Sequence, residues 1–304
     1  MIFFNASLHQ PRRATLPRFV SQALFAGLVA LALTGLTACS GGGDSKATTA
    51  VATASPQNTG MFSACTTKGA QSDAKASLGK FMVTTNVWNP NSASGYQECV
   101  NAKYDNATGL VDAKITWDAT PIANEVLSYP NLAYGWQVGT DQGSTSPKLP
   151  ATVGNVGDLI ASGKAETTCA PGATCTMNTA FELLFSNTPT PNVWPPTAEI
   201  MVWLQATCQE CNAGKLAGTV TIDGVIFDIY KGAVTPPTGT ASWTYVAYVA
   251  KTTVTQFNFN FKNFLNDSVT RGYIKSNDYL AVVELGTEIT KGQGNTVISG
   301  YGIR

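Results

Sequence analysis

Histidine is almost missing from this sequence of 304 residues. The single one is His9, and it lies in an N-terminal segment that we expect to be removed. A mature chain without histidine has neither a Ser–His or Cys–His catalytic pair nor a histidine ligand for a metal ion. Acid–base chemistry would then fall to Asp, Glu, Tyr or Lys, and paired carboxylates are the obvious route in a secreted hydrolase.

Charged residues are also few. They make up 12% of the chain, with 19 basic and 19 acidic side chains. Residues 1–38 contain three Arg and no acid, so their removal leaves 16 basic side chains and a formal charge of −3. Such a surface has no electrostatic footprint for nucleic acid. A neutral polymer is the more natural partner.

The apolar run near the N-terminus, 23–36, is too short to span a bilayer but has the length of a signal-peptide core. It follows a basic segment and leads into Leu36-Thr37-Ala38-Cys39, which resembles the lipobox of bacterial lipoproteins. We predict a lipoprotein signal peptide over 1–38 and lipidation of Cys39. An ordinary signal peptide with a chance cysteine is the alternative. The absence of Asp after Cys39 favours the outer membrane if the organism is Gram-negative.

The mature chain divides into a tether and one domain. Residues 39–60 are small and polar and lack the large apolar side chains that a core requires, so we predict a flexible tether. Residues 61–304 suffice for one large domain, and we see neither an internal repeat nor a second domain. We expect a monomer that contacts the membrane only through the lipid.

Six cysteines remain beyond Cys39, an even number that suits disulfides in an oxidising compartment. Fifteen connectivities are possible, and proximity favours three local pairs. The Cys-x-x-Cys motif at 208–211 would also fit a redox or zinc site, but it has no second ligand pair. The expected disulfides are Cys65 with Cys99, Cys169 with Cys175, and Cys208 with Cys211.

From about residue 80, short runs rich in Thr, Val and aromatic residues are separated by the turn residues Gly, Pro and Asn. This pattern predicts an all-β sandwich or jelly roll. Phe261, Phe264 and Leu265 have helical spacing, so we expect a single short helix over 261–269. Examples of the expected strands are 80–87, 109–117, 181–186, 199–204, 218–222, 225–230, 242–249 and 279–284.

The segment 198–204 reads Ala-Glu-Ile-Met-Val-Trp-Leu. As a strand it places three aliphatic side chains on one face and Glu199, Met201 and Trp203 on the other. A carboxylate between apolar neighbours is costly unless that face lines a functional cleft. A second glutamate, Glu288, ends another strand-like run. Glu284 is its rival, because both lie on one face of that run.

Four short sequence blocks, listed below in chain order, resemble glycoside hydrolase family 12, a family of small jelly-roll endoglucanases and xyloglucanases. The resemblance covers about 78–304. It implies a β-jelly-roll sandwich of two curved antiparallel sheets and the Cys65–Cys99 disulfide, with no metal or organic cofactor. The blocks are Asn86-Val87-Trp88-Asn89, Ser128-Tyr129-Pro130-Asn131, 199–204, and Gly286-Thr287-Glu288 followed by Gly292.

The resemblance implies a retaining endo-β-1,4-glucanase. Glu199 would be the nucleophile and Glu288 the acid/base, with their carboxyl groups about 5–5.5 Å apart. Glu199 would have to be ionised at rest and Glu288 protonated. The substrate would be a β-1,4-glucan such as amorphous cellulose, mixed-linkage glucan or xyloglucan.

The chain departs from the family ahead of the nucleophile. The family has a Tyr-Asp pair there, whose Asp hydrogen-bonds the nucleophile, and this chain has Phe181-Glu182. Glu182 would support Glu199 with one extra methylene. This departure motivates a second hypothesis, a non-catalytic β-glucan-binding lipoprotein; a transglycosylase is a third.

Four further side chains are candidates for substrate binding. Trp88 would stack on a sugar ring, with Asn86 beside it as a hydroxyl ligand. Met201 would pack under the bound sugar, and Trp203 would share the cleft with Glu199. Tyr129 and Asn131 we expect to be structural.

Overall fold

The computed structural model describes residues 60–68, 74–123, 125–209, 211–235 and 241–304. The predicted signal peptide, Cys39 and the predicted tether up to residue 59 lie outside these residues. Among the described residues, none of the helical segments has both the length and the apolar character needed to cross a bilayer.

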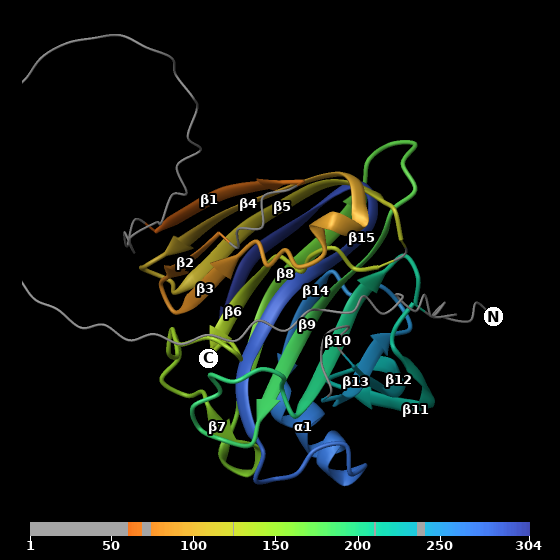
Figure 1. The fold of residues 1–304 in the computed structure, drawn as a ribbon. Helices are drawn as coiled ribbons and strands as arrows, with labels where there is room; N and C mark the ends of the chain where they lie inside the picture. Colours follow the sequence, from red (N-terminus) through yellow and green to blue (C-terminus); the bar gives the residue numbers. More distant parts are fainter. Residues whose placement is uncertain (1–59, 69–73, 124, 210, 236–240) are drawn as a thin grey trace, which may run out of the picture. The chain divides into compact units, whose positions relative to one another are not determined.

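The strands form two curved sheets that share one strand, as a jelly-roll sandwich requires (Figure 1). We call the sheet that carries the candidate carboxylates the site sheet and the other the back sheet. The site sheet has the order β2(Lys75–Leu78), β3(Phe81–Thr84), β6(Asn131–Gly135), β15(Tyr279–Ile303), β9(Thr176–Ser186), β10(Ala198–Ala206), β13(Trp243–Ala250), β12(Val225–Val234) and β11(Gly214–Ile222).

The back sheet contains β1(Met61–Thr67), β4(Ala93–Asp105), β5(Leu110–Pro121), the second half of β15, β8(Ile160–Cys169) and β14(Gln256–Asn260). The short strand β7(Ala151–Thr152) pairs with the start of β15. Strand pairs are antiparallel throughout, with one difference from the expected pattern. β10 and β13 run parallel, because the chain leaves β10 for the sheet edge and returns through β11 and β12.

β15 is longer than the sequence indicates. The alternating pattern predicts a strand over 279–284, but β15 continues to Ile303. Its first part pairs with β6 and β9, and from Gly292 onward it pairs with β5 and β8. Gly292 has φ +86°, and a Cβ there would lie 2.5 Å from the carbonyl oxygen of Thr174. Glycines that the sequence pattern would assign to a loop therefore allow the strand to cross from one sheet to the other.

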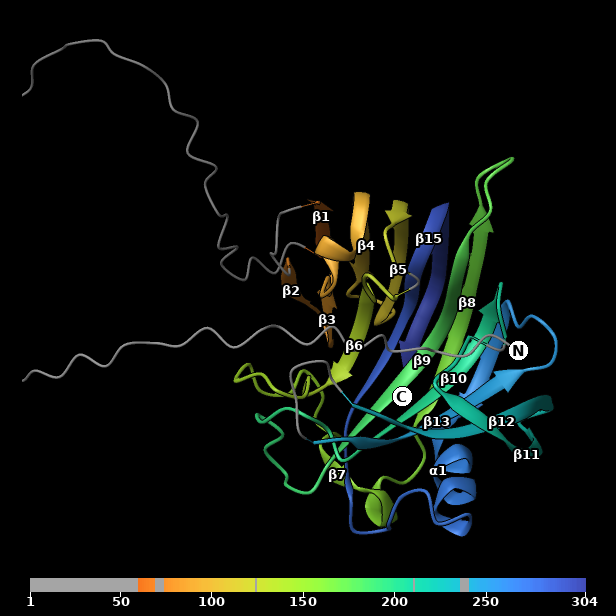
Figure 2. The same cartoon turned by 45° about the vertical axis from the view of Figure 1, so that its right-hand side comes forward.

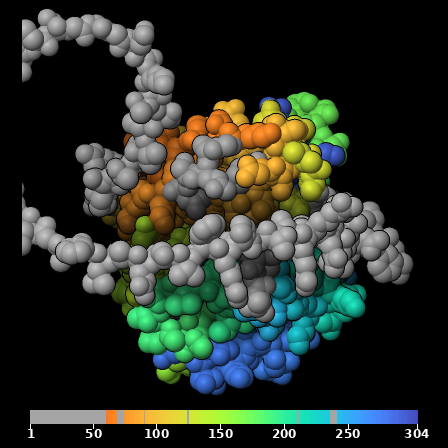
Figure 3. Space-filling model, viewed as in Figure 1, coloured from red at the N-terminus to blue at the C-terminus, as the bar shows by residue number. Residues whose placement is uncertain are grey.

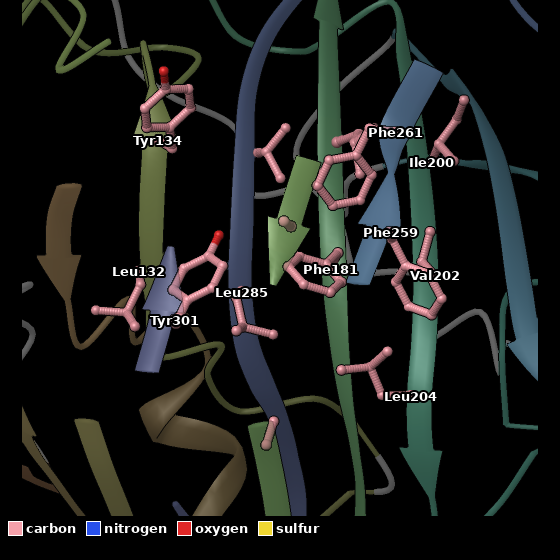
Figure 4. Packing of buried hydrophobic residues seen from close by; sticks show 14 of the residues in the cluster. Leu132, Tyr134, Phe181, Ile200, Val202, Leu204, Phe259, Phe261, Leu285 and Tyr301 are labelled. Atoms are coloured by element: carbon pink, nitrogen blue, oxygen red, sulfur yellow. The ribbon is translucent and has the colours of Figure 1, made fainter. Parts of the chain in front are cut away.

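The core lies between the sheets (Figure 4). Ile200, Val202 and Leu204 of β10 point into it, as the alternation predicts. Phe181 of β9 packs edge-on against Phe257 and Phe261 at centroid distances of 5.1 and 5.0 Å. Because this face of the site sheet is filled with apolar side chains, polar side chains on the same strands are directed to the opposite face.

The helix α1(Phe261–Thr270) closes one end of the sandwich (Figure 2). The Asn260 side chain caps it by accepting a hydrogen bond from the Lys262 backbone N–H. Phe261, Phe264 and Leu265 are fully buried, so the predicted helix and its apolar face are confirmed. In the space-filling view the blue surface around α1 lies at the opposite end of the described domain from the orange surface of β1 (Figure 3).

The three expected disulfides are present. Cys65 and Cys99 lie directly opposite one another in the β1–β4 pairing. Cys169 and Cys175 join the end of β8 to the start of β9 across a turn. Cys208 and Cys211 are joined as the expected local pair, so the Cys-x-x-Cys motif forms a disulfide.

Candidate active site

Four glutamates lie on one face of three neighbouring strands of the site sheet. Glu199 of β10 lies opposite Leu184 of β9, and Glu182 of β9 lies opposite Glu284 of β15. Residues directly opposite in an antiparallel pair share a face, as do residues two apart on a strand. Glu199, Glu182, Glu284 and Glu288 therefore all point away from the apolar core.

The two sequence-predicted catalytic glutamates are on strands separated by β9. Glu199 lies opposite Leu184, and Glu288 lies opposite Asn178, which is six positions closer to the N-terminal end of β9. The curvature of the sheet and the length of the side chains must bring these carboxylates toward one another. They interact electrostatically, because the charge of Glu288 helps to raise the pKa of Glu199. The separation required of a retaining pair stays a prediction.

Glu199 is held by an indole. Trp243 Nε1 donates a hydrogen bond to Glu199 Oε2 over 2.7 Å, and the Glu199 side chain is 9% exposed. Burial raises the pKa of Glu199 to about 7, while the hydrogen bond from Trp243 opposes that rise. A donor that favours the carboxylate at a desolvated position suits a nucleophile that must be ionised to react.

Glu288 has a comparable arrangement with a different donor. Asn178 Nδ2 donates to Glu288 Oε2, and the two residues lie directly opposite in the β9–β15 pairing. Burial raises the pKa of Glu288 and the amide opposes the rise. Glu288 is half-buried, so its carboxyl group keeps access to a ligand. A raised pKa is what a general acid needs.

Glu182 lies on β9, the strand between those of Glu199 and Glu288. It is opposite Met201 on one side and Glu284 on the other, one diagonal step from Glu199. Its carboxyl group is within reach of a hydrogen bond with that of Glu284. Burial raises the pKa of Glu182 well above its ordinary value, and the charges of its three glutamate neighbours add to the effect.

Met201 and Trp203 share the face of Glu199, as the alternation of the strand predicts, and both are buried. They are only 2% and 3% exposed. Trp203 Nε1 donates to Met201 Sδ over 3.3 Å, and Tyr245 Oη donates to the same sulfur over 3.6 Å. Both side chains pack with one another under the site face; their direct contact with a sugar stays a prediction.

Trp88 exposes its aromatic side chain near β3, on the opposite side of β15 from β10 in the strand order of the site sheet. It follows β3, it is 43% exposed, and its backbone N–H donates to the Leu127 carbonyl. Asn86, two residues earlier, is half-buried and has φ +40°. The left-handed backbone at Asn86 redirects the chain after β3, which presents Trp88 to solvent.

Sequence reasoning missed two contributors, Trp243 and Asn178, which hold the two catalytic candidates. Glu284 was considered only as a rival to Glu288, and Asn131, expected to be structural, donates from Nδ2 to Glu284 Oε2 over 3.3 Å. The sequence offers one signal for Asn178, which is its period-two spacing from Glu182. Tyr129 is structural, as expected, because its hydroxyl donates to the Ala180 and Glu284 carbonyls.

A β-jelly-roll sandwich with carboxylates gathered on one face defines a class, the jelly-roll glycoside hydrolases. The model of glycosyl hydrolase family 12 matches residues 79–302, and the chain belongs to that family. Endoglucanase S of Pectobacterium parmentieri is 26% identical over 72% of this chain and 80% of its own. The native family 12 xyloglucanase from Bacillus licheniformis superposes with a TM-score of 0.68, at 23% identity over 79% of this chain and 99% of that one.

A third relative shows that the family fold does not by itself establish turnover. The inactive glycoside hydrolase XLP1 of Phytophthora nicotianae is 27% identical over 73% of this chain and 85% of its own. Activity must therefore be argued from the side chains of the site.

Proposed function

We propose that this protein is a retaining endo-β-1,4-glucanase. The observation that carries the proposal is the placement of Glu199 and Glu288 on the same face of the site sheet, each held by a neutral donor. Family membership supplies the reaction class, and both carboxylates that the reaction needs are present.

The residues take the following roles. Glu199 attacks the anomeric carbon and forms a covalent glycosyl-enzyme, while Glu288 protonates the departing glycosidic oxygen. Glu288 then removes a proton from the incoming water, which releases the sugar with its anomeric configuration retained. With Glu199 charged, the nearby negative charge favours the protonated form of Glu288.

The substrate class is a neutral β-1,4-glucan, either cellulose-like, mixed-linkage or xyloglucan. An exposed Trp88 offers the flat apolar surface on which a sugar ring stacks. The chain has few charged residues, which suits an uncharged polymer. The relatives include proteins described as endoglucanase and as xyloglucanase, so the preferred glucan is a matter for measurement.

The test is release of reducing ends from soluble β-glucan and xyloglucan by the mature chain, beside Glu199→Gln. We expect turnover that falls by several orders of magnitude in the variant, because the amide cannot form the covalent intermediate. Glu166→Gln, at an exposed position of β8, is the matched control and should keep wild-type turnover. Equal rates in Glu199→Gln and wild type would refute the assignment, and the ratio of rates on the two polymers ranks the substrates.

A non-catalytic β-glucan-binding protein is the second candidate. Glu182 in place of the family's Asp and the existence of an inactive relative favour it. Binding of glucan without release of reducing ends would select this alternative. A transglycosylase would show longer products at high concentrations of a sugar acceptor.

We also propose that the protein is anchored to the cell envelope by a lipid on Cys39, in the outer membrane if the organism is Gram-negative. The lipobox-like sequence supports the anchor, and three disulfides support an oxidising, extracytoplasmic compartment. Loss of the protein from the membrane fraction in Cys39→Ala is the expected result, and unchanged membrane association would contradict the proposal.

A further inference from the structure

Glu182 and Glu284 lie directly opposite one another on β9 and β15, with their carboxyl groups within reach of a mutual hydrogen bond. Two ionised carboxylates only accept hydrogen bonds, so this contact needs a proton on one of them. Glu284 is 2% exposed, and its Oε1 atom receives no hydrogen bond from a described amide or hydroxyl group. A proton shared with Glu182 is therefore the partner that satisfies this buried oxygen.

Among the described residues, no Lys or Arg forms an ion pair with either glutamate. The two ion pairs of the described residues, Lys251–Asp228 and Arg271–Asp267, involve none of the four glutamates. Two carboxylates in contact at a desolvated position cannot both be charged without a large free-energy cost. Asn131, which donates to Glu284 Oε2, is neutral and offsets only part of one charge.

We propose that Glu284 is a positioning residue, which shares one proton with Glu182, holds Glu182 beside the nucleophile, and keeps the pair at a single negative charge through neutral pH. The proposal rests on the proposed function, in which Glu199 is the nucleophile. It also accounts for the departure from the family at Glu182. The longer side chain is held across the strand by Glu284 and does not have to fold back toward its own backbone.

The pair also makes activity sensitive to alkaline pH. When the shared proton leaves, a second negative charge appears between Glu199 and Glu288. Two charged carboxylates repel one another and only accept hydrogen bonds, so Glu182 is then no longer held beside Glu199. The titratable groups that face the pair are Glu199 of β10, Glu288 of β15, Tyr245 of β13, Tyr129 before β6, and Tyr301 at the end of β15.

The first test detects the proton directly. Infrared difference spectra at pH 7 would be taken in a Glu199→Gln/Glu288→Gln background, which removes the signals of both catalytic candidates. We expect the carbonyl stretch of one protonated carboxyl group to disappear when either Glu284→Gln or Glu182→Gln is added. It should persist with the control Glu166→Gln. A spectrum unchanged by both additions would overturn the proposal, whether or not the protein turns over a glucan.

The second test separates positioning from packing. Glu284→Gln keeps a donor to Glu182 and one charge on the pair, so we expect kcat near neutral pH to stay within about threefold of wild type. Its alkaline limb should extend to higher pH, because no proton remains to be lost. Glu284→Leu leaves Glu182 unheld, and kcat should fall by on the order of 10- to 100-fold with KM little changed.

The outcomes distinguish this proposal from the proposed function. Wild-type kcat and pH profile in both Glu284 variants would overturn the role of Glu284. Wild-type turnover in Glu199→Gln would instead refute the assigned nucleophile, while the infrared result would still decide whether the proton is shared.

Discussion

At the scale of single residues, the protonation state of each catalytic glutamate, Glu199 or Glu288, depends on one neutral hydrogen-bond donor. Trp243 lies two residues before Tyr245, whose position in β13 pairs with Glu199 in the parallel register. Its indole therefore reaches Glu199 from the neighbouring strand. Trp243 also contacts Trp194 edge-on, with ring centroids 5.4 Å apart, which fixes the orientation of the indole.

Replacement of Trp243 by Phe removes the donor and keeps most of the ring. A hydrogen bond to the charged form lowers a pKa, so its loss should raise the pKa of Glu199 above about 7. Because the nucleophile must be ionised, the acidic limb of the pH profile of kcat/KM should move to higher pH. Steady-state kinetics across the pH range measures this shift.

The matched control is Trp136→Phe. The Trp136 indole donates to the Thr140 carbonyl over 2.8 Å and touches none of the glutamates in this way. An acidic limb that moves equally in both variants would show that the effect comes from general loosening and not from the lost donor.

The sequence could predict the catalytic candidates but not their partners. Glu199 is visible because its strand alternates, and Glu288 because it stands in a Gly-Thr-Glu context. Glu284 could be seen only as a rival to Glu288 on the same face. Trp243 and Asn178 are partners across strands, and which residue lies opposite which depends on a register that distant segments set together.

At the scale of elements, β15 is joined to its neighbours by a buried group of four threonines. Their Oγ1 atoms form a chain of hydrogen bonds of 2.6 to 3.1 Å, and all four side chains are at most 5% exposed. The group lies where β15 passes from the site sheet to the back sheet, and it includes the residue before Glu288. Its members are Thr167 of β8, Thr179 of β9, and Thr287 and Thr296 of β15.

We expect Thr287→Val to destabilise the domain by about 1–3 kcal/mol, because it removes two buried hydrogen bonds at nearly constant volume and leaves the Thr179 and Thr296 hydroxyls bonded only to Thr167. Urea unfolding measures the loss. Thr287→Ser keeps the hydroxyl and should recover part of the stability. Thr221→Val, at an exposed position of β11, should change stability by less than about 0.5 kcal/mol. A Thr287→Val protein as stable as wild type would argue against a structural role for the group.

Elements with strong local patterns were predictable from the sequence, and elements defined by long-range contacts were not. The helix at 261–269 and the alternating strands are confirmed with small changes in their bounds. The second half of β15 was missed, because residues 286–302 contain five glycines that resemble a loop. Only the close approach of β5, β8 and the Trp117 ring to that segment shows why glycine is needed there.

At the scale of the whole molecule, burial of four glutamates on one face couples stability to pH. The pKa of Glu199 is raised to about 7 and that of Glu284, at which the Glu182–Glu284 pair loses its shared proton, to about 8; the pKa of Glu288 is also raised. In the unfolded chain these groups titrate near their ordinary value of 4.5. Between pH 4.5 and 8 the folded state therefore binds more protons than the unfolded state.

Stability then changes in a direction opposite to that of a protein held by salt-bridged carboxylates. When the unfolded state binds fewer protons, the free energy of unfolding falls as pH rises. We expect the melting temperature to be highest near pH 4.5 and to fall toward pH 8, by roughly 2–4 °C for each kcal/mol lost. Thermal unfolding at constant ionic strength measures it. Glu199→Gln/Glu284→Gln should flatten the slope, since amides do not titrate, and a melting temperature that rises over this range would contradict burial of uncompensated carboxyl groups.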